Sequence, residues 1–424
     1  MEKCWIIMNK LDIFKDVADI MMYDASSCKD VAGANTEKYE RNITRDMPDE
    51  EFLFLVNSYL NTFGLTGHLS FGLTGFGGIL FRVQRYEDML YVTDSAKNCI
   101  LQKGDIITGI DGMSVSEYGK RHAMFLFDEI EERQAPHWVR LLKFAKKVTY
   151  IRKQNRAIQE YEIQRGHFVS PEKKYDCRRL SEKSTLLRLA DFGEEDQIQH
   201  LYAENADLLK NTRNLIVDVR NNDGGSDTCF LPLLQYALPN GQSLKQVYVD
   251  DGVQKDGSEI NYSERNCELR LQTIREYLKM DLSQDTLDVI NTMKQNLENH
   301  KGMGFCATED DSMEIPVVGD SLVEKVYIIT DSGCGSSGDN FVYMFGMLPK
   351  VTVVGRPTMG ILDYSNVAFV KYDDFTLMYP TSRLSSLDHG KGMMRHGVPV
   401  DVYVPWTPKH LERDVDLEAV LNMI

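Results

Sequence analysis

The segment VYIITDSGCGSSGDNFVYMFGML, Val326–Leu348, decides the fold of this chain. Its first residues, Val326–Thr330, form an apolar run rich in β-branched side chains, which predicts a buried strand. A turn of glycines and serines follows. After Asp339, apolar residues recur at the i, i+3, i+4, i+7 spacing of one helix face, namely Phe341, Met344, Phe345 and Leu348. The segment therefore predicts a strand, a tight turn and a helix, the arrangement of an α/β protein.

Ser336 lies in this turn, where a nucleophile is well presented. Its hydroxyl is lifted out of the sheet, and the next backbone N–H groups lie at a helix N-terminus, where they can bind an oxyanion. We therefore take Ser336 as the candidate nucleophile and Ser337 as a source of one N–H. Serine and glycine are also ordinary at any helix start, so a plain cap stays an open alternative. Cys334 is a rival nucleophile, although it precedes the predicted helix.

Composition narrows the class of protein. The 424 residues are 42% hydrophobic and 26% charged, which is ordinary for a globular protein with ample core. The net charge of −16 argues against a nucleic-acid-binding surface, because phosphate binding needs clustered lysine and arginine. No apolar run approaches the length of a membrane span. The sequence therefore predicts no membrane span and no nucleic-acid partner, and it leaves the oligomeric state open.

The cysteines and the N-terminus bear on the compartment. The eight cysteines are scattered, with no CxxC pair and no histidine at zinc spacing, which favours reduced thiols and no metal site. The first residues, MEKCWIIMNKLDIF, carry too short an apolar run for a signal peptide. We expect a cytoplasmic location for the chain as it stands, and a periplasmic or extracytoplasmic one if a leader has been removed.

Residues 1–73 are expected to be a helical region. Asp12–Met22 is amphipathic, and a second helix begins at Pro48 with acids in its first turn, as a helix N-terminus prefers. The region closes with LTGHLSFG, residues 65–72. His68 lies here in a turn of small residues rather than on an apolar face, so by itself it is an ordinary loop histidine.

Residues 74–168 are expected to form a small β domain with a helical insertion at 117–144. Two motifs, GFGGI at 75–79 and QKGDIITGIDGMSV at 102–115, resemble those of PDZ domains. The resemblance implies that an extended peptide binds by strand addition, with its carboxylate at the loop of Gly75, Phe76, Gly77 and Gly78. A β module that serves only as a spacer is the alternative.

Residues 169–424 are expected to form the α/β core. Leu215–Val219 is an apolar strand that ends in RNNDGG, and a helix is expected around Phe230. The adjacent glycines Gly224 and Gly225 let the backbone approach a ligand and leave N–H groups to point at it. Residues 241–315 are charged and helical in pattern, which predicts an insertion or lid.

Three separated segments resemble one family in order. They are LIVDVRNNDGGSD at 215–227, residues 327–341 with GRPTMG at 355–360, and GVPVDVYVPWTP at 397–408. They resemble the C-terminal processing (tail-specific) peptidases and the related tricorn-type proteases. The resemblance implies a crotonase/ClpP-like spiral β/α core and a serine nucleophile, here Ser336. It also implies an oxyanion hole from the N–H groups of Gly224 or Gly225 and of Ser337.

The general base separates two branches of that family. The tail-specific branch uses a lysine, but Ile361 stands at that position and the nearest following lysine is Lys371. The tricorn-like branch uses a histidine that falls on His68, so the resemblance implies His68 as the base. The residues that orient it in that branch fall on Gly67 and Met394, which cannot do so. Another acid, Asp363 or Asp388, or a water could take this role.

The leading hypothesis is a serine-type endopeptidase that hydrolyses peptides or unfolded protein tails without a metal or organic cofactor. Ser336 would attack the peptide carbonyl and His68 would move the proton. The alternative is a catalytically weakened protein on the same fold that binds a peptide or an apolar ligand. The missing orienting residues favour this alternative.

Overall fold

The computed structural model describes residues 8–128, 130–170, 174–250, 257–279, 284–308 and 315–424. Within it the chain forms two compact units, each built from separated stretches of sequence. The first comprises Met1–Gly75, Lys255–Asp310 and Asp363–Gly392, and the second comprises Phe76–Gln254, Asp311–Leu362 and Met393–Ile424.

The first unit contains an antiparallel sheet in the order β1-β18-β13-β14, with β17 also paired to β18. The strands are β1 (Ser70–Leu73), β13 (Ser258–Tyr262), β14 (Gly304–Thr308), β17 (Tyr364–Tyr372) and β18 (Phe375–Leu384). Its helices are α1 (Lys10–Asp19), α2 (Glu37–Glu40), α3 (Asp49–Leu60), α10 (Glu264–Tyr277) and α11 (Gln284–His300). The rings of Phe52, Phe71 and Phe375 pack together where α3 meets the sheet.

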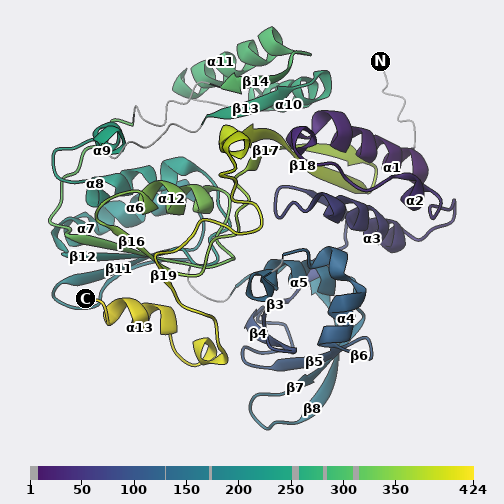
Figure 1. Ribbon diagram of the computed structural model, residues 1–424, viewed down its shortest axis with the longest axis horizontal. Helices are drawn as coiled ribbons and strands as arrows, with labels where there is room; N and C mark the ends of the chain where they lie inside the picture. Colours follow the sequence, from purple (N-terminus) through teal and green to yellow (C-terminus); the bar gives the residue numbers. More distant parts are fainter. Residues whose placement is uncertain (1–7, 129, 171–173, 251–256, 280–283, 309–314) are drawn as a thin grey trace. The chain divides into compact units, whose positions relative to one another are not determined.

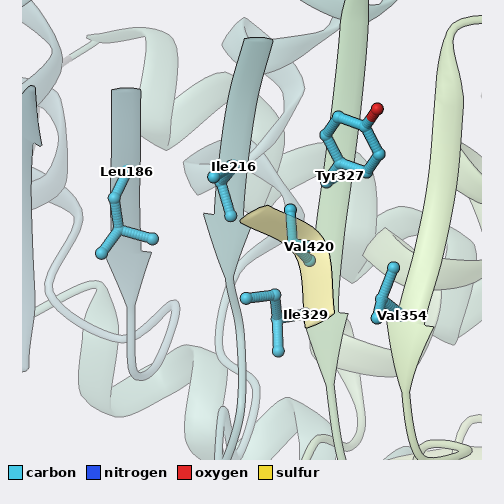
Figure 2. Packing of buried hydrophobic residues seen from close by; sticks show 6 residues of the cluster. All are labelled: Leu186, Ile216, Tyr327, Ile329, Val354 and Val420. Atoms are coloured by element: carbon cyan, nitrogen blue, oxygen red, sulfur yellow. The ribbon is translucent and has the colours of Figure 1, made fainter. Parts of the chain in front are cut away.

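The second unit contains a mainly parallel sheet in the order β10-β11-β12-β15-β16-β19. The strands are β10 (Tyr175–Arg179), β11 (Ser184–Leu189), β12 (Asn214–Asp218), β15 (Lys325–Thr330), β16 (Val351–Gly355) and β19 (Val402–Tyr403). Only β10 runs antiparallel to its neighbour. Figure 2 shows helix α13 (Val415–Leu421) on one face, where Val420 packs among Leu186, Ile216, Tyr327, Ile329 and Val354.

Helices α8 (Leu234–Ala237) and α12 (Ser337–Gly346) pack on the other face of this sheet, and α6 (Glu195–Glu204) and α7 (Ala206–Asn211) lie on the same side (Figure 1). Phe341 and Phe345 of α12 form an aromatic cluster with Phe192 and Phe230. Because helices cover both faces, the inner strands are apolar throughout rather than alternating. The predicted α/β class is confirmed.

A second sheet of this unit has the order β3-β4-β5-β7-β8, with β6 paired to β5 and a separate pair β2-β9. The strands are β2 (Gly78–Ile79), β3 (Phe81–Tyr86), β4 (Met89–Ser95), β5 (Ile106–Ile110), β6 (Met113–Ser114), β7 (Lys147–Ile151), β8 (Ile158–Glu162) and β9 (Arg165–Gly166). It corresponds to the small β domain expected from the PDZ-like motifs.

The structure refines two local expectations. The helical insertion expected over 117–144 consists of two short helices, α4 (Val115–Arg121) and α5 (Ala135–Leu142), with 3₁₀ turns at Ala123–Phe125 and Glu131–Gln134. Pro136 lies in the first turn of α5, where its missing N–H costs nothing but where it prevents a continuous helix. The charged segment 241–315 holds not only helices, including α9 (Leu244–Asp250), but also the strands β13 and β14.

The order of the parallel strands brings three loops together. Strand β15 pairs with β12 on one side and β16 on the other, all in the same direction. The loops that follow these strands therefore leave the same edge of the sheet, and ligand sites of α/β sheets form at this edge. They carry Gly224 and Gly225, Ser336, and Thr358–Ile361 respectively.

Candidate active site

Ser336 lies between β15 and α12 in a backbone conformation that serines rarely adopt. It is the N-cap of α12, with φ 59° and ψ −121°. A residue with a Cβ at positive φ costs about 1–3 kcal/mol, and such conformations cluster at functional sites. A serine on a strained turn between a strand and a helix is the geometry of a nucleophile elbow.

The buried carboxylate of Asp339 holds this turn. One of its oxygens accepts the N–H of Ser336 (2.9 Å) and of Ile361 (2.8 Å), and the other accepts the N–H of Gly360 (2.8 Å). Burial raises the pKa of Asp339, although the hydrogen bonds that it accepts act in the opposite direction. Asp339 therefore ties the loop after β15 to the loop after β16.

Gly224 faces the nucleophile at very short range. A Cβ at this position, where φ is +90°, would lie 2.6 Å from the Cβ of Ser336 and 3.1 Å from the backbone nitrogen of Ser337. A Cβ at Gly225, where φ is +144°, would lie 2.1 Å from the carbonyl oxygen of Phe192. Only glycine fits either position, because of both the positive φ and the space.

The N–H groups predicted to bind the oxyanion differ in whether they already donate to an acceptor in the protein. The N–H of Gly224 donates to the side-chain oxygen of Asn222 (3.0 Å). Within the part of the chain that the structure describes, no acceptor takes the N–H of Gly225 or of Ser337. The Ser337 hydroxyl donates to the carbonyl of Gly225 (2.8 Å), which joins the two loops. The N–H groups of Gly225 and Ser337 thus meet one requirement of oxyanion donors, and a role of Gly224, Gly225 and Ser337 in an oxyanion hole stays a prediction.

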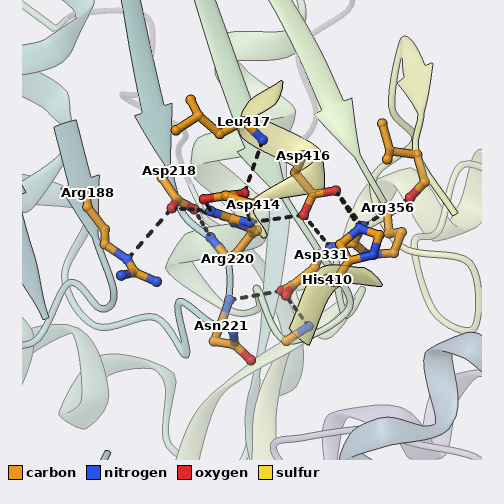
Figure 3. Close-up of polar contacts among 12 residues, drawn as sticks. Arg188, Asp218, Arg220, Asn221, Asp331, Arg356, His410, Asp414, Asp416 and Leu417 are labelled. Atoms are coloured by element: carbon orange, nitrogen blue, oxygen red, sulfur yellow. Dashed lines mark hydrogen bonds and ion pairs between the residues drawn. The ribbon is translucent and has the colours of Figure 1, made fainter. Parts of the chain in front are cut away.

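A network of charged residues fixes the start of the glycine loop (Figure 3). Arg220 binds Asp218, Asp414 and Asp416 through its guanidinium. The next residue, Asn221, donates its N–H to Asp331 (2.9 Å), which also accepts the N–H of Gly333 (3.0 Å). The loop that carries the glycines and the loop that carries Ser336 are therefore joined twice, by the bond from Asn221 to Asp331 and by the bond from Ser337 to Gly225.

Cys334, the rival nucleophile, is wholly buried. Burial raises the pKa of its thiol well above the ordinary value, with the charge of Asp339 acting in the same direction. A nucleophilic cysteine needs accessible thiolate. The environment therefore favours Ser336 over Cys334.

This arrangement of a strained serine and facing glycines lies in a segment with a family match. The sequence profile of peptidase family S41 matches residues 183–404, just over half of the chain. The chain belongs to peptidase family S41. The family predicted from the sequence motifs is thereby confirmed.

Solved structures agree with this membership at the level of the fold. Mature CPAF complexed with lactacystin has a TM-score of 0.63 and 12% identity, covering 98% of this chain and 97% of that chain. Mature CPAF has a TM-score of 0.60 and 12% identity, covering 98% and 96%. No curated protein matches the sequence.

His68, the expected base of this S41 chain, belongs to the first unit. It is the central residue of a three-residue turn in which the N–H of Leu69 bonds to the carbonyl of Gly67. Its Nδ1 lies 2.6 Å from the carbonyl oxygen of Tyr364, the first residue of β17. Its ring is thus held by a main-chain group.

The two acids suggested as orienting residues lie on the same unit as His68. Asp363 is buried and directly precedes Tyr364. Both carboxylate oxygens of Asp388 accept from Arg383, at 2.9 and 3.1 Å, and these bonds hold the pKa of Asp388 below its ordinary value. The carboxylate of Asp388 is therefore engaged in an ion pair.

The loop suggested for peptide binding, Gly75 to Gly78, contacts the chain's own strand β9. Gly78 pairs with Gly166, and a Cβ at Gly77 would lie 2.8 Å from the backbone nitrogen of Gly166. The Phe76 ring lies under the guanidinium of Arg165. A role of Gly75, Phe76, Gly77 and Gly78 in binding peptide stays a prediction.

No described helix is long and apolar enough to cross a membrane. Within the described ranges, no group of three or more histidine, cysteine, aspartate or glutamate side chains could hold a metal ion.

Sequence reasoning missed three contributors. Asp339 follows Ser336 at the S-x-x-D spacing of a capping box, so a signal for its backbone contact was present. Arg133, described below, lies in the segment expected to be a helical insertion, where its pattern gave no sign of contacts outside the insertion. The carbonyl of Tyr364 has no sequence signal, because every residue has a carbonyl.

Proposed function

We propose that this S41 protein is a serine-type endopeptidase that cleaves peptides or unfolded protein tails, with Ser336 as nucleophile and His68 as general base. The observation that carries the proposal is the conformation of Ser336. A serine is held at φ 59° by a buried acid, opposite a glycine that leaves no room for a side chain. A helix cap needs no such strain.

The reaction would follow the usual course of acyl transfer. The Ser336 hydroxyl oxygen bonds to the peptide carbonyl carbon while Nε2 of His68 takes its proton. The N–H groups of Gly225 and Ser337 receive the resulting oxyanion, an interaction worth about 3–4 kcal/mol in comparable sites. His68 then gives the proton to the leaving amine, and water releases the acyl group from Ser336 by the same path.

The absence of a lysine at Ile361 supports a histidine base, and with it the tricorn-like branch. The second candidate is a catalytically weakened protein that binds a peptide or an apolar ligand. It is favoured by Gly67 and Met394 at the positions expected to orient the histidine, and by the engagement of the Gly224 N–H with Asn222.

Labelling with a fluorophosphonate probe separates the two candidates. We expect the full chain to be labelled, Ser336→Ala to lose all labelling, and His68→Ala to be labelled at least a hundredfold more slowly, since general-base catalysis contributes about 10²–10⁴. The matched control is Cys334→Ala, which should be labelled as the native chain is.

Cleavage of an unfolded protein by the same variants completes the test. A chain with no serine-dependent labelling and no cleavage would be the binding protein of the second candidate. Native-rate labelling of His68→Ala would leave the peptidase in place but remove His68 as its base.

A further inference from the structure

We propose that the main-chain carbonyl of Tyr364 orients His68, and that Asp30 and Arg383 are positioning residues that hold Tyr364 for this role. The inference rests on the proposed function, in which His68 is the base. It assigns the orienting role to a main-chain carbonyl, whereas the sequence suggested a side-chain acid, Asp363 or Asp388.

The contact with Tyr364 determines which nitrogen of the His68 ring carries the hydrogen. The Nδ1 of His68 lies 2.6 Å from the oxygen of Tyr364. A carbonyl oxygen can only accept a hydrogen bond, so Nδ1 must carry the hydrogen. In the neutral ring, Nε2 then carries no hydrogen and keeps its lone pair. A general base needs this lone pair to accept a proton. The contact thus selects the tautomer that can take a proton through Nε2.

The main chain around His68 and the main chain around Tyr364 are both attached to strand β18 of the same sheet. The turn that contains it closes from Leu69 back to Gly67, and strand β1 begins at Ser70, which pairs with Met378 of β18. Strand β17, which begins at Tyr364, pairs with the same strand β18. His68 therefore lies next to strand β1 and Tyr364 begins strand β17, and both strands pair with β18. This shared pairing limits the movement of His68 relative to Tyr364.

The ring of Tyr364 is held at its hydroxyl group. Its hydroxyl donates to Asp30 (3.0 Å), and burial, followed by the charge of Asp30, raises the pKa of this hydroxyl, so it stays protonated. Asp30 also accepts from Arg383 at 2.9 and 2.8 Å. Arg383 pairs with Tyr364 across β17 and β18. Tyr364 is thus fixed at its backbone and at the end of its ring.

Arg383 is a suitable anchor because its side chain is fully buried. It binds Glu259 (2.7 Å) and Asp388 in addition to Asp30. Hydrogen bonds to a buried charge are among the strongest that a protein makes, and a buried arginine without its acids would be costly. The ring of Tyr364 is therefore held through Asp30 by an ion-pair cluster that is centred on a buried arginine.

The direct test is ¹⁵N NMR of the full chain labelled at histidine, with His68→Gln to assign the signal. We expect neutral His68 to carry its hydrogen on Nδ1, the reverse of the preference of the imidazole of histidine in water. A hydrogen on Nε2 would overturn the inference. This readout does not require activity, so a failure of the proposed peptidase would instead appear as the absence of Ser336-dependent labelling.

A kinetic test uses Tyr364→Phe, which keeps the carbonyl and the ring but loses the bond to Asp30. We expect kcat for an unfolded substrate to fall about three- to tenfold with KM unchanged, and the Nδ1–H tautomer to lose population. The matched control is Tyr372→Phe at the other end of β17, which loses an equivalent bond to Asp16 (2.7 Å).

Tyr372→Phe should leave kcat and the tautomer unchanged. Equal effects of the two variants would show a general loss of stability and would overturn the positioning role. If Tyr364→Phe does not fold, the tautomer of the native chain still decides whether the carbonyl orients His68.

Discussion

Gly224 shows at the scale of one residue how closely the glycine loop approaches the nucleophile. A methyl group there would meet the Cβ of Ser336 at 2.6 Å and the carbonyl of Gly335 at 3.0 Å. Real Cβ atoms do not approach other atoms so closely, so either the serine or the loop would have to move. The loop can move only by disturbing the N–H groups that would face the oxyanion.

We therefore predict that Gly224→Ala lowers the rate of fluorophosphonate labelling at least a hundredfold. Gly241→Ala is the matched control, because Gly241 also has a positive φ, +77°, but nothing lies within 4 Å of its Cβ position. Both variants should lose about 1–2 kcal/mol of stability from the backbone conformation, measured by urea unfolding. Native labelling of Gly224→Ala would contradict the proposed geometry of the site.

At the scale of elements, Arg133 joins the small β domain to the loop after β16. Its side chain is buried and pairs with Asp128 (3.0 Å). The same guanidinium donates to the carbonyls of Pro357 (3.3 Å), Thr358 (2.5 Å) and Met359 (3.1 Å). This loop in turn supplies the N–H groups of Gly360 and Ile361 to Asp339. Arg133 thus supports the serine turn from a distance.

We predict that Arg133→Ala lowers the free energy of unfolding by about 3–5 kcal/mol, because it leaves the buried Asp128 without its cation and removes a donor from three carbonyls. Labelling of Ser336 should slow about tenfold or more as the loop loosens. Arg85→Ala is the control: Arg85 lies in strand β3 of the same unit, and its acidic partners Glu131 (2.9 Å) and Asp88 (3.8 Å) are both largely exposed. Such a pair is worth about 0–1 kcal/mol.

Urea unfolding and probe labelling of Arg133→Ala and Arg85→Ala would distinguish a specific support from a general effect of lost charge. Equal behaviour of the two variants would contradict the role given to Arg133. Arg133→Lys should recover only part of the loss, since an ammonium group cannot match the planar fork of donors.

At the scale of the whole molecule, stability in acid should depend on Asp416. This carboxylate is buried and binds Arg356 at 2.7 and 2.8 Å, Arg220 at 3.0 Å and His410 at 3.3 Å (Figure 3). Burial by itself would raise the pKa of Asp416, but the hydrogen bonds from His410 and Arg356 and the charges of the arginines bring it well below the ordinary value.

The sign of the pH effect follows from that lowered pKa. A carboxyl whose folded pKa is lowered stabilises the protein fully above its unfolded pKa of about 4, and this stabilisation is lost as the pH falls below that value. We predict that Asp416→Asn lowers the free energy of unfolding at pH 7 by about 3–5 kcal/mol and flattens its decline below about pH 4.

Urea unfolding between pH 7 and pH 3 measures both effects. The control is Asp320→Asn, which removes an exposed pair with Lys210 (2.7 Å) and should change stability by less than about 1 kcal/mol. An Asp416→Asn variant with native stability at pH 7 would contradict the structural role of this network.

Much of the fold was accessible from local patterns. The strand at Val326–Thr330 and the helix that follows it are confirmed, because apolar periodicity reports burial directly. Strand β10 was missed, since Tyr175–Arg179 carries polar side chains at the edge of a sheet. The pattern indicated a helical insertion over 117–144 but not its division into short helices and 3₁₀ turns, because tertiary contacts such as those of Arg133 stabilise the turns.

For the site, the sequence by itself determined the type of chemistry: a serine at a turn between strand and helix, a glycine pair after a neighbouring strand, and motifs in the order of one family. Residue identity and spacing carry that information. Only the tertiary structure decided the positive φ of Ser336, the close approach of Gly224, and the contact of His68 with the Tyr364 carbonyl. These depend on main-chain atoms that every residue shares, so their partners are chosen by how the chain packs and not by side-chain identity.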